Sequence, residues 1–215
     1  SARRRERGVS RPLSESVEMS RYYGQVNLAS AKNADQNVDS WERFFQRTRV
    51  KYENGLDVTE ECGRICDIML TRDPRMRQLI KQNFKPQDYF DIHARMIGTG
   101  MIGGKACGML LSRKITENQR PDIFSRIEPH DSFYIGSDVF YSYIVDNGFW
   151  DLKIEQKTEA GYFALAESIS EKIMQGKFSE GMERSFRALL DYYGSDPVIV
   201  RSSSILEDGF GNAFA

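Results

Sequence analysis

The sequence predicts an α+β fold, in which helices cover a sheet and a mainly helical segment precedes it. From residue 39 to about residue 85, apolar side chains recur at the spacing of amphipathic helices. Beyond residue 96, short apolar runs that suit strands alternate with helical patterns, as they do in a sheet covered by helices. The length of 215 residues allows one well-packed domain, or one domain with a substantial appendage.

The composition is that of a soluble globular protein, with 40% hydrophobic and 28% charged residues. A net charge of −1 provides no general attraction to nucleic acid or to a membrane surface, so any phosphate binding must be local. No apolar run approaches the ~18 residues that cross a bilayer, and no secretory signal core is apparent, so we expect a cytoplasmic protein. The three cysteines argue against a disulfide framework. Cys62 and Cys66 stand one helical turn apart without a further ligand nearby in sequence, which favours buried apolar side chains over a zinc site.

The first 96 residues fall into two predicted parts. Residues 1–38 are expected to form a poorly ordered arm, whose five early arginines suit a solvated segment better than a nucleic-acid site because no aromatics are interleaved. Residues 39–96 are expected to form a helical extension, in which Asp73 and Pro74 predict a helix start and Pro86 ends the pattern. The alternation of apolar and polar residues from Phe90 to Met96 fits either a half-buried strand or a short helix.

Residues 97–215 contain the strands and helices of the predicted sheet domain. A glycine cluster is followed by an apolar helical stripe from Cys107, and residues 131–148 predict a strand, a helix capped by Ser137 or Asp138, and a terminating Gly148. Two further amphipathic helices are expected at residues 158–175 and 179–193. The apolar residues 198–200 then predict a buried strand.

The glycine cluster GTGMIGGKACGMLL, residues 98–111, allows several interpretations. Gly98, Gly100 and Gly103 satisfy the dinucleotide fingerprint G-x-G-x-x-G, but the segment ENQRPDIFSR stands where a second strand with a ribose-binding acid is required. An ATPase loop fails because Thr99 replaces its first glycine and Ala106 replaces the hydroxyl that holds magnesium. The cluster can also be a tight loop with a solvated lysine.

A cation and hydroxyl groups far along the chain supply another candidate. In VIVRSSSILED, residues 198–208, Arg201 follows the predicted strand beside Ser202 and Ser203. These hydroxyls can simply cap the next turn, with Arg201 paired to Glu207. Alternatively, a planar, always charged guanidinium at a rigid strand end suits polyphosphate oxygens.

Three motifs in the same order resemble one family. IGGKACGMLL resembles a G-G-K element, SFYIGSDVFYSYI resembles the strand and helix that follow, and VIVRSSSILEDG resembles a V-R-S-S element with an acidic pair. These are elements of the N-terminal nucleotide-binding domain of phosphoenolpyruvate synthase and pyruvate phosphate dikinase. The resemblance implies an ATP-grasp-like fold, with residues 97–215 as the first nucleotide-binding subdomain, truncated before the second. The activity that it implies is transfer of a phosphoryl group from ATP to a histidine or another acceptor.

The resemblance also implies roles for individual residues. Gly103, Gly104 and Lys105 would bind ATP phosphates, Arg201 would stabilise the transferred group, and Ser202 and Ser203 would flank its path. Phosphoryl transfer depends mainly on such positioned positive charge. The acidic pair Glu207 and Asp208 is expected to be architectural, and the acids that bind Mg²⁺ are expected in the second subdomain. Neither His93 nor His130 resembles the family's phosphorylated histidine, so both are expected to be surface residues.

One departure leaves a second hypothesis open. Ala213 stands where the family usually has a serine, in a loop that approaches the nucleotide. The alternative is therefore a non-catalytic sensor or assembly module that keeps the fold. We expect the chain to be part of a longer protein and inactive by itself; its phosphoryl acceptor and oligomeric state do not follow from the sequence.

Overall fold

The computed structural model describes residues 40–155, 166–203, 208–209 and 212–213. By its internal contacts the chain divides into two compact units, Ser1–Val58 and Thr59–Ala215. The expected arm, residues 1–38, lies outside the described residues.

In the first unit, helix α3 spans Ser40–Glu53. Trp41 stacks on Phe44 and meets the edge of Phe45, with 5.5 Å between ring centroids in both pairs. Phe45 is 1% exposed, and Thr48 is buried with its hydroxyl donating to the Phe44 carbonyl. The predicted helical pattern is therefore confirmed for this segment.

The second unit begins with short helices whose ends are set by local signals. Asp73 accepts the N–H of Met76 at 2.9 Å and precedes Pro74, so this helix start agrees with the prediction. Pro86 begins a helix, and the Lys85 N–H donates to Asp88 Oδ2 at 2.6 Å, so the Phe90 segment is helical and not a strand. These elements are α4 (Thr59–Ile65), the π-helical η1 (Cys66–Leu70), α5 (Pro74–Asn83) and α6 (Pro86–His93).

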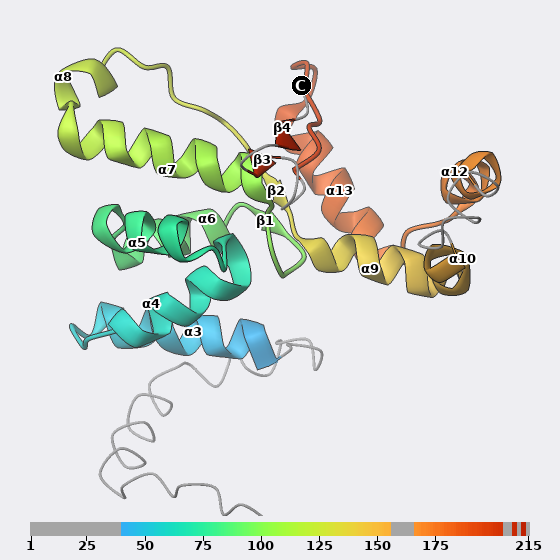
Figure 1. Ribbon diagram of the computed structural model, residues 1–215, viewed down its shortest axis with the longest axis horizontal. Helices are drawn as coiled ribbons and strands as arrows, with labels where there is room; N and C mark the ends of the chain where they lie inside the picture. Colours follow the sequence, from blue (N-terminus) through green and yellow to red (C-terminus); the bar gives the residue numbers. More distant parts are fainter. Residues whose placement is uncertain (1–39, 156–165, 204–207, 210–211, 214–215) are drawn as a thin grey trace, which may run out of the picture. The chain divides into compact units, whose positions relative to one another are not determined.

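Helix α7, Gly104–Gln119, packs on α5 (Figure 1). Lys114 Nζ lies 2.7 Å from Asp88 Oδ1 of α6, and both side chains are 18% exposed. Asn118 donates to the Asn83 carbonyl oxygen at 2.9 Å. The short helix α8, Pro121–Phe124, follows α7.

The strands are short. Strand β1, Met96–Ile97, pairs in parallel with β2, Tyr134–Ile135, and Met96 lies opposite Tyr134. Near the C-terminus β3, Asp208–Gly209, pairs antiparallel with β4, Asn212–Ala213. The described chain is therefore mostly helical with a small parallel sheet, which agrees with the predicted α+β class.

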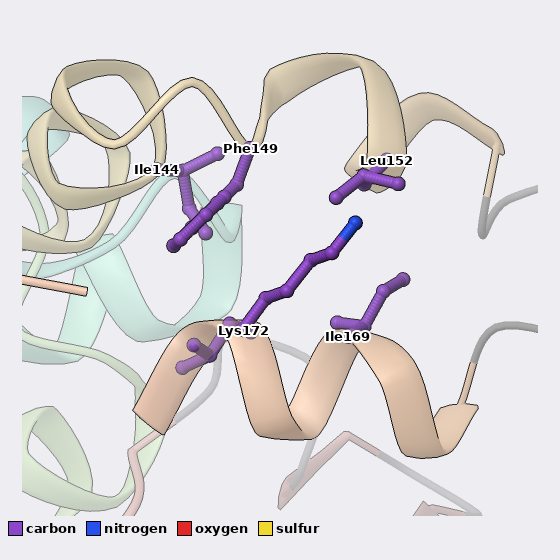
Figure 2. A pocket seen from close by; sticks show the side chains of 6 residues that line it. Ile144, Phe149, Leu152, Ile169 and Lys172 are labelled. Carbon is purple, nitrogen blue, oxygen red and sulfur yellow. The ribbon is translucent and has the colours of Figure 1, made fainter. Parts of the chain in front are cut away.

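Helices α9 (Ser137–Asp146), α10 (Trp150–Glu155) and α12 (Ala166–Gln175) form a second group. The Tyr143 hydroxyl donates to the Ile173 carbonyl at 2.5 Å, which ties α9 to α12. Figure 2 shows the small apolar pocket between these helices, along which the side chain of Lys172 extends. The first eight residues of the helix predicted at 158–175 lie outside the described residues. The pocket is lined by Ile144, Phe149, Leu152, Ile169, Lys172 and Ile173.

Helix α13, Glu180–Tyr193, has the predicted ends, with Ser179 accepting from Met182 N–H and Gly194 at φ 59°. Its last turn is attached to the loop before β2. Tyr192 donates to the Asp131 carboxylate and Tyr193 to the Asp131 carbonyl oxygen at 2.9 Å. Arg95 pairs with the same carboxylate. Asp131 thus anchors the helix that leads to Arg201.

The predicted buried strand at residues 198–200 is wrong. This segment has no regular structure, and Ile199 and Val200 are 88% and 85% exposed. A strand forms by hydrogen bonding to a neighbouring strand, and no strand of the described chain pairs with this segment. Its apolar composition alone therefore misled the prediction.

Candidate phosphate-binding site

The glycine cluster forms a tight loop between β1 and α7. Gly98, Gly100 and Gly103 have φ angles of 74°, 83° and 86°, in the region that glycine adopts most readily. The loop therefore needs glycine at the three positions that produce the dinucleotide fingerprint. Backbone conformation alone accounts for this spacing.

Several N–H groups of this loop donate to the protein itself. Thr99 N–H donates to Asp138 Oδ1 at 2.6 Å, Met101 N–H to Ser137 Oγ at 3.1 Å, and Ile102 N–H to the Met69 carbonyl at 3.0 Å. A dinucleotide site would need such donors for the pyrophosphate. The loop therefore gives no support to the dinucleotide interpretation of the fingerprint.

Lys105 is the second residue of α7 and is half-buried. Gly103 occupies the N-cap position, where it has no side chain to accept an N–H of the first turn. The start of a helix carries partial positive charge, so an anion is favoured there. The predicted placement of Lys105 at a helix start is confirmed.

The second motif meets the first at this helix start. Ser203 Oγ accepts the N–H of Ala106 at 3.1 Å, and the Ser203 carbonyl oxygen lies where a Cβ of Gly103 would be. Only glycine allows the two backbones to approach this closely. Lys105 directly precedes Ala106, and Arg201 lies two residues before Ser203. The hydrogen bond therefore brings together the two segments that carry these cations, although they are distant in sequence.

The predicted site residues differ in burial. Arg201 and Ser202 are exposed, whereas Ser203 is half-buried against α7. Ser203 therefore acts in the structure as a remote cap of α7, a role that its sequence position did not predict. Glu207 lies outside the described residues, and the backbone of Asp208 pairs with that of Ala213.

Sequence reasoning missed the function of Ser137 and Asp138. One of the two was predicted to cap its own helix, but Gly136 is the N-cap of α9 and neither side chain caps it. Their oxygens instead accept N–H groups of the glycine loop. The sequence carries a signal for an acceptor at this helix start, but none for a partner almost forty positions earlier.

The histidines and thiols are not among the predicted site residues. His130 is exposed, and the pKa of its imidazole is lowered by partial burial and by Arg113 and Arg95. Cys66 and Cys107 are buried free thiols, and burial raises their pKa values to about 11 and about 12. Cys62 is buried as well, so the prediction of buried small side chains is confirmed.

Comparison with known proteins agrees with this geometry. A glycine-rich helix start with a lysine, held against a segment with an exposed arginine, suits a protein that binds polyphosphate. Residues 99–215 match the family model of the pyruvate phosphate dikinase AMP/ATP-binding domain. The chain therefore belongs to this family. Comparison with curated proteins and with solved structures finds no match. Among the described residues, no helix is long and apolar enough to cross a membrane.

Proposed function

We propose that the chain is the ATP-binding portion of a phosphotransferase of the phosphoenolpyruvate synthase and pyruvate phosphate dikinase type. It would move a phosphoryl group from ATP to a histidine or another acceptor. The observation that carries this proposal is the hydrogen bond between Ser203 and Ala106, because it joins the two motifs to which the family resemblance assigns phosphate binding. An ATP-grasp-like first subdomain over residues 97–215, with the helical extension of residues 39–96 before it, belongs to the same proposal.

The two cations would have different roles. Lys105 would supply a movable point charge to the phosphate oxygens near the start of α7. Arg201, on the exposed segment beside Ser202, would hold the transferred group with two parallel hydrogen bonds. The backbone of Gly103 and Gly104 would let the polyphosphate approach the helix start.

The resemblance places the ligands of Mg²⁺ in a second subdomain. Among the described residues, no group of three or more His, Cys, Asp or Glu side chains could hold a metal ion without the nucleotide. We expect this chain to bind ATP weakly by itself, with a Kd on the order of 1 mM, and to be inactive alone. We expect the parent enzyme to work in the cytoplasm, where ATP is available.

A titration with Mg-ATP, followed by the amide signals of ¹⁵N-labelled chain, tests the proposal. We expect shifts at residues 103–106 and 201–203, reduced by Lys105→Ala and Arg201→Ala. Lys81→Ala and Arg187→Ala, which remove exposed cations from α5 and α13, are matched controls.

No shift in these segments up to about 20 mM ATP, twenty times the expected Kd, would contradict the proposal. Tight binding by calorimetry would contradict the expectation that this chain binds ATP weakly by itself. Binding that neither Lys105→Ala nor Arg201→Ala changes would favour the non-catalytic module instead.

A further inference from the structure

The glycine loop and the first turn of α9 hold each other through reciprocal hydrogen bonds. Thr99 N–H donates to Asp138 Oδ1 at 2.6 Å, and Asp138 N–H donates back to the Thr99 carbonyl at 3.3 Å. Met101 N–H donates to Ser137 Oγ at 3.1 Å, and Ser137 N–H donates to the Met101 carbonyl at 3.1 Å. Each segment therefore satisfies the backbone groups of the other. We call these four bonds, between residues 99 and 101 and residues 137 and 138, the loop clamp.

The fit around the loop clamp leaves no room for side chains. A Cβ at Gly98 would lie 2.5 Å from both Asp138 Oδ1 and Val139 Cγ2. A Cβ at Gly100 would meet Ser137 Oγ, and one at Gly136 would meet the Thr99 carbonyl oxygen. Three glycines thus permit the approach from both sides, so the loop clamp depends on this set of small residues.

Asp138 is well placed for this contact electrostatically. Its carboxylate lies in the first turn of α9, where the partial positive charge of the helix start favours an anion. A hydrogen bond from a backbone N–H to a carboxylate is stronger than one between neutral groups. The side chain therefore serves two elements at once: it complements α9 and it holds Thr99.

The loop clamp bears directly on Lys105. Three residues separate Met101 from Lys105, and the first of them, Ile102, donates its N–H to the Met69 carbonyl. The glycine loop is thus attached to α9 and to η1 just before α7 begins. We propose that Asp138 and Ser137 are positioning residues for Lys105, since they fix the loop that determines where α7 starts. This inference rests on the proposed contact of Lys105 with ATP phosphates.

The first experiment measures amide hydrogen exchange by NMR in the whole chain without ligand. In Asp138→Ala we expect exchange to rise about tenfold at Thr99, as for the loss of one hydrogen bond to a charged group, and also at Ala106 and Cys107, whose N–H groups donate to Ser203 Oγ and to the Gly103 carbonyl at the start of α7. Asp138→Asn keeps an acceptor oxygen and should show little change. Asp151→Ala removes an acid from the equivalent position of α10 and is the matched control. A change confined to Thr99 would overturn the inference.

The second experiment is a double-mutant cycle on ATP binding. We expect Lys105→Ala and Asp138→Ala each to raise the Kd about fivefold, the size of one exposed charge contact, and Asp138→Ala to have no further effect once Lys105 is removed. Equal effects of Asp138→Ala in both backgrounds would mean that it acts independently of Lys105, and would overturn the inference. A stability loss alone would not produce this coupling.

The two proposals fail in different ways. If Lys105→Ala leaves the Kd unchanged, the proposed function is wrong, and the positioning role falls with it. If Lys105→Ala weakens binding but Asp138→Ala does not, only the positioning role is wrong. If Asp138→Ala does not fold, Ser137→Ala, which removes the neighbouring bond of the loop clamp, takes its place in both experiments. The same results would then support or overturn the positioning role.

Discussion

Replacing Gly103 by alanine tests the contact that joins the two motifs. Gly103 has φ 86° and ψ 167°, a region that is almost exclusive to glycine and costs about 1–3 kcal/mol for other residues. The new Cβ would also occupy the position of the Ser203 carbonyl oxygen. The Ser203 segment would have to move and lose its bond to Ala106, which adds about 1 kcal/mol to the backbone strain. We expect a total loss of about 2–4 kcal/mol.

Gly108→Ala is the matched control in the same helix. A Cβ at Gly108 would have no atom of another part of the described chain within 4 Å, and the residue is helical. Alanine there should stabilise the chain by about 0.5–1 kcal/mol, because glycine loses more conformational entropy in a helix. The two substitutions add the same methyl group five positions apart and should have opposite effects.

Unfolding should be followed by a probe in the second unit alone. The chain has two tryptophans, Trp41 in the first unit and Trp150 in the second, so a Trp41→Phe background leaves one fluorescent reporter. For a chain of this size, Gly103→Ala should lower the Tm by roughly 5–15 °C. A Gly103→Ala variant as stable as Gly108→Ala would refute the close approach of Ser203 to α7.

Three further predictions follow from contacts elsewhere in the second unit. Cys66 and Cys107 should resist thiol reagents at pH 8 in the folded chain, because their pKa values are raised from 9.0 to about 11 and about 12. For the same reason, the stability measured in urea titrations should not change through these thiols below pH 9, and it should fall as the pH rises from 9 through these raised pKa values. Asp73→Ala should cost about 1 kcal/mol in the same assay, because it removes the N-cap of α5. Lys114→Met and Asp88→Asn should each destabilise the chain by about 1–2 kcal/mol, and the double variant by less than their sum, since the two form one partly buried pair.

The helices could be predicted because their determinants are local. Asp73 with Pro74, and Ser179 with Gly194, specify helix ends within a few residues, and the structure places the ends there. The same kind of signal also explains why the Phe90 segment was ambiguous. Its alternation fits a strand, but Pro86 and Asp88 start a helix at its beginning.

The errors concern residues whose partners are distant in sequence. Ser137 and Asp138 are ordinary helix-start residues, and an oxygen acceptor there can serve either its own helix or another segment. The exposed residues 198–200 have the composition of a buried strand, but burial requires a neighbouring strand that composition does not specify. In both cases tertiary contacts determined the outcome: which segment the Ser137 and Asp138 oxygens bond to, and whether residues 198–200 form a buried strand. The local sequence is compatible with either outcome.

The candidate site could be predicted from the sequence only in part. The local pattern predicts Lys105 at a helix start, and the resemblance predicts that Lys105 and Arg201 act on the same ATP. The structural support for a shared site is Ser203, which bonds to the residue after Lys105 and lies two residues after Arg201. The variant Ser203→Ala tests whether this hydrogen bond brings Arg201 to the nucleotide. It should leave α7 intact and the helix signal in circular dichroism unchanged, yet abolish the ATP-induced amide shifts at Arg201 and Ser202. Unchanged shifts there would mean that the two cations meet the nucleotide without this bond.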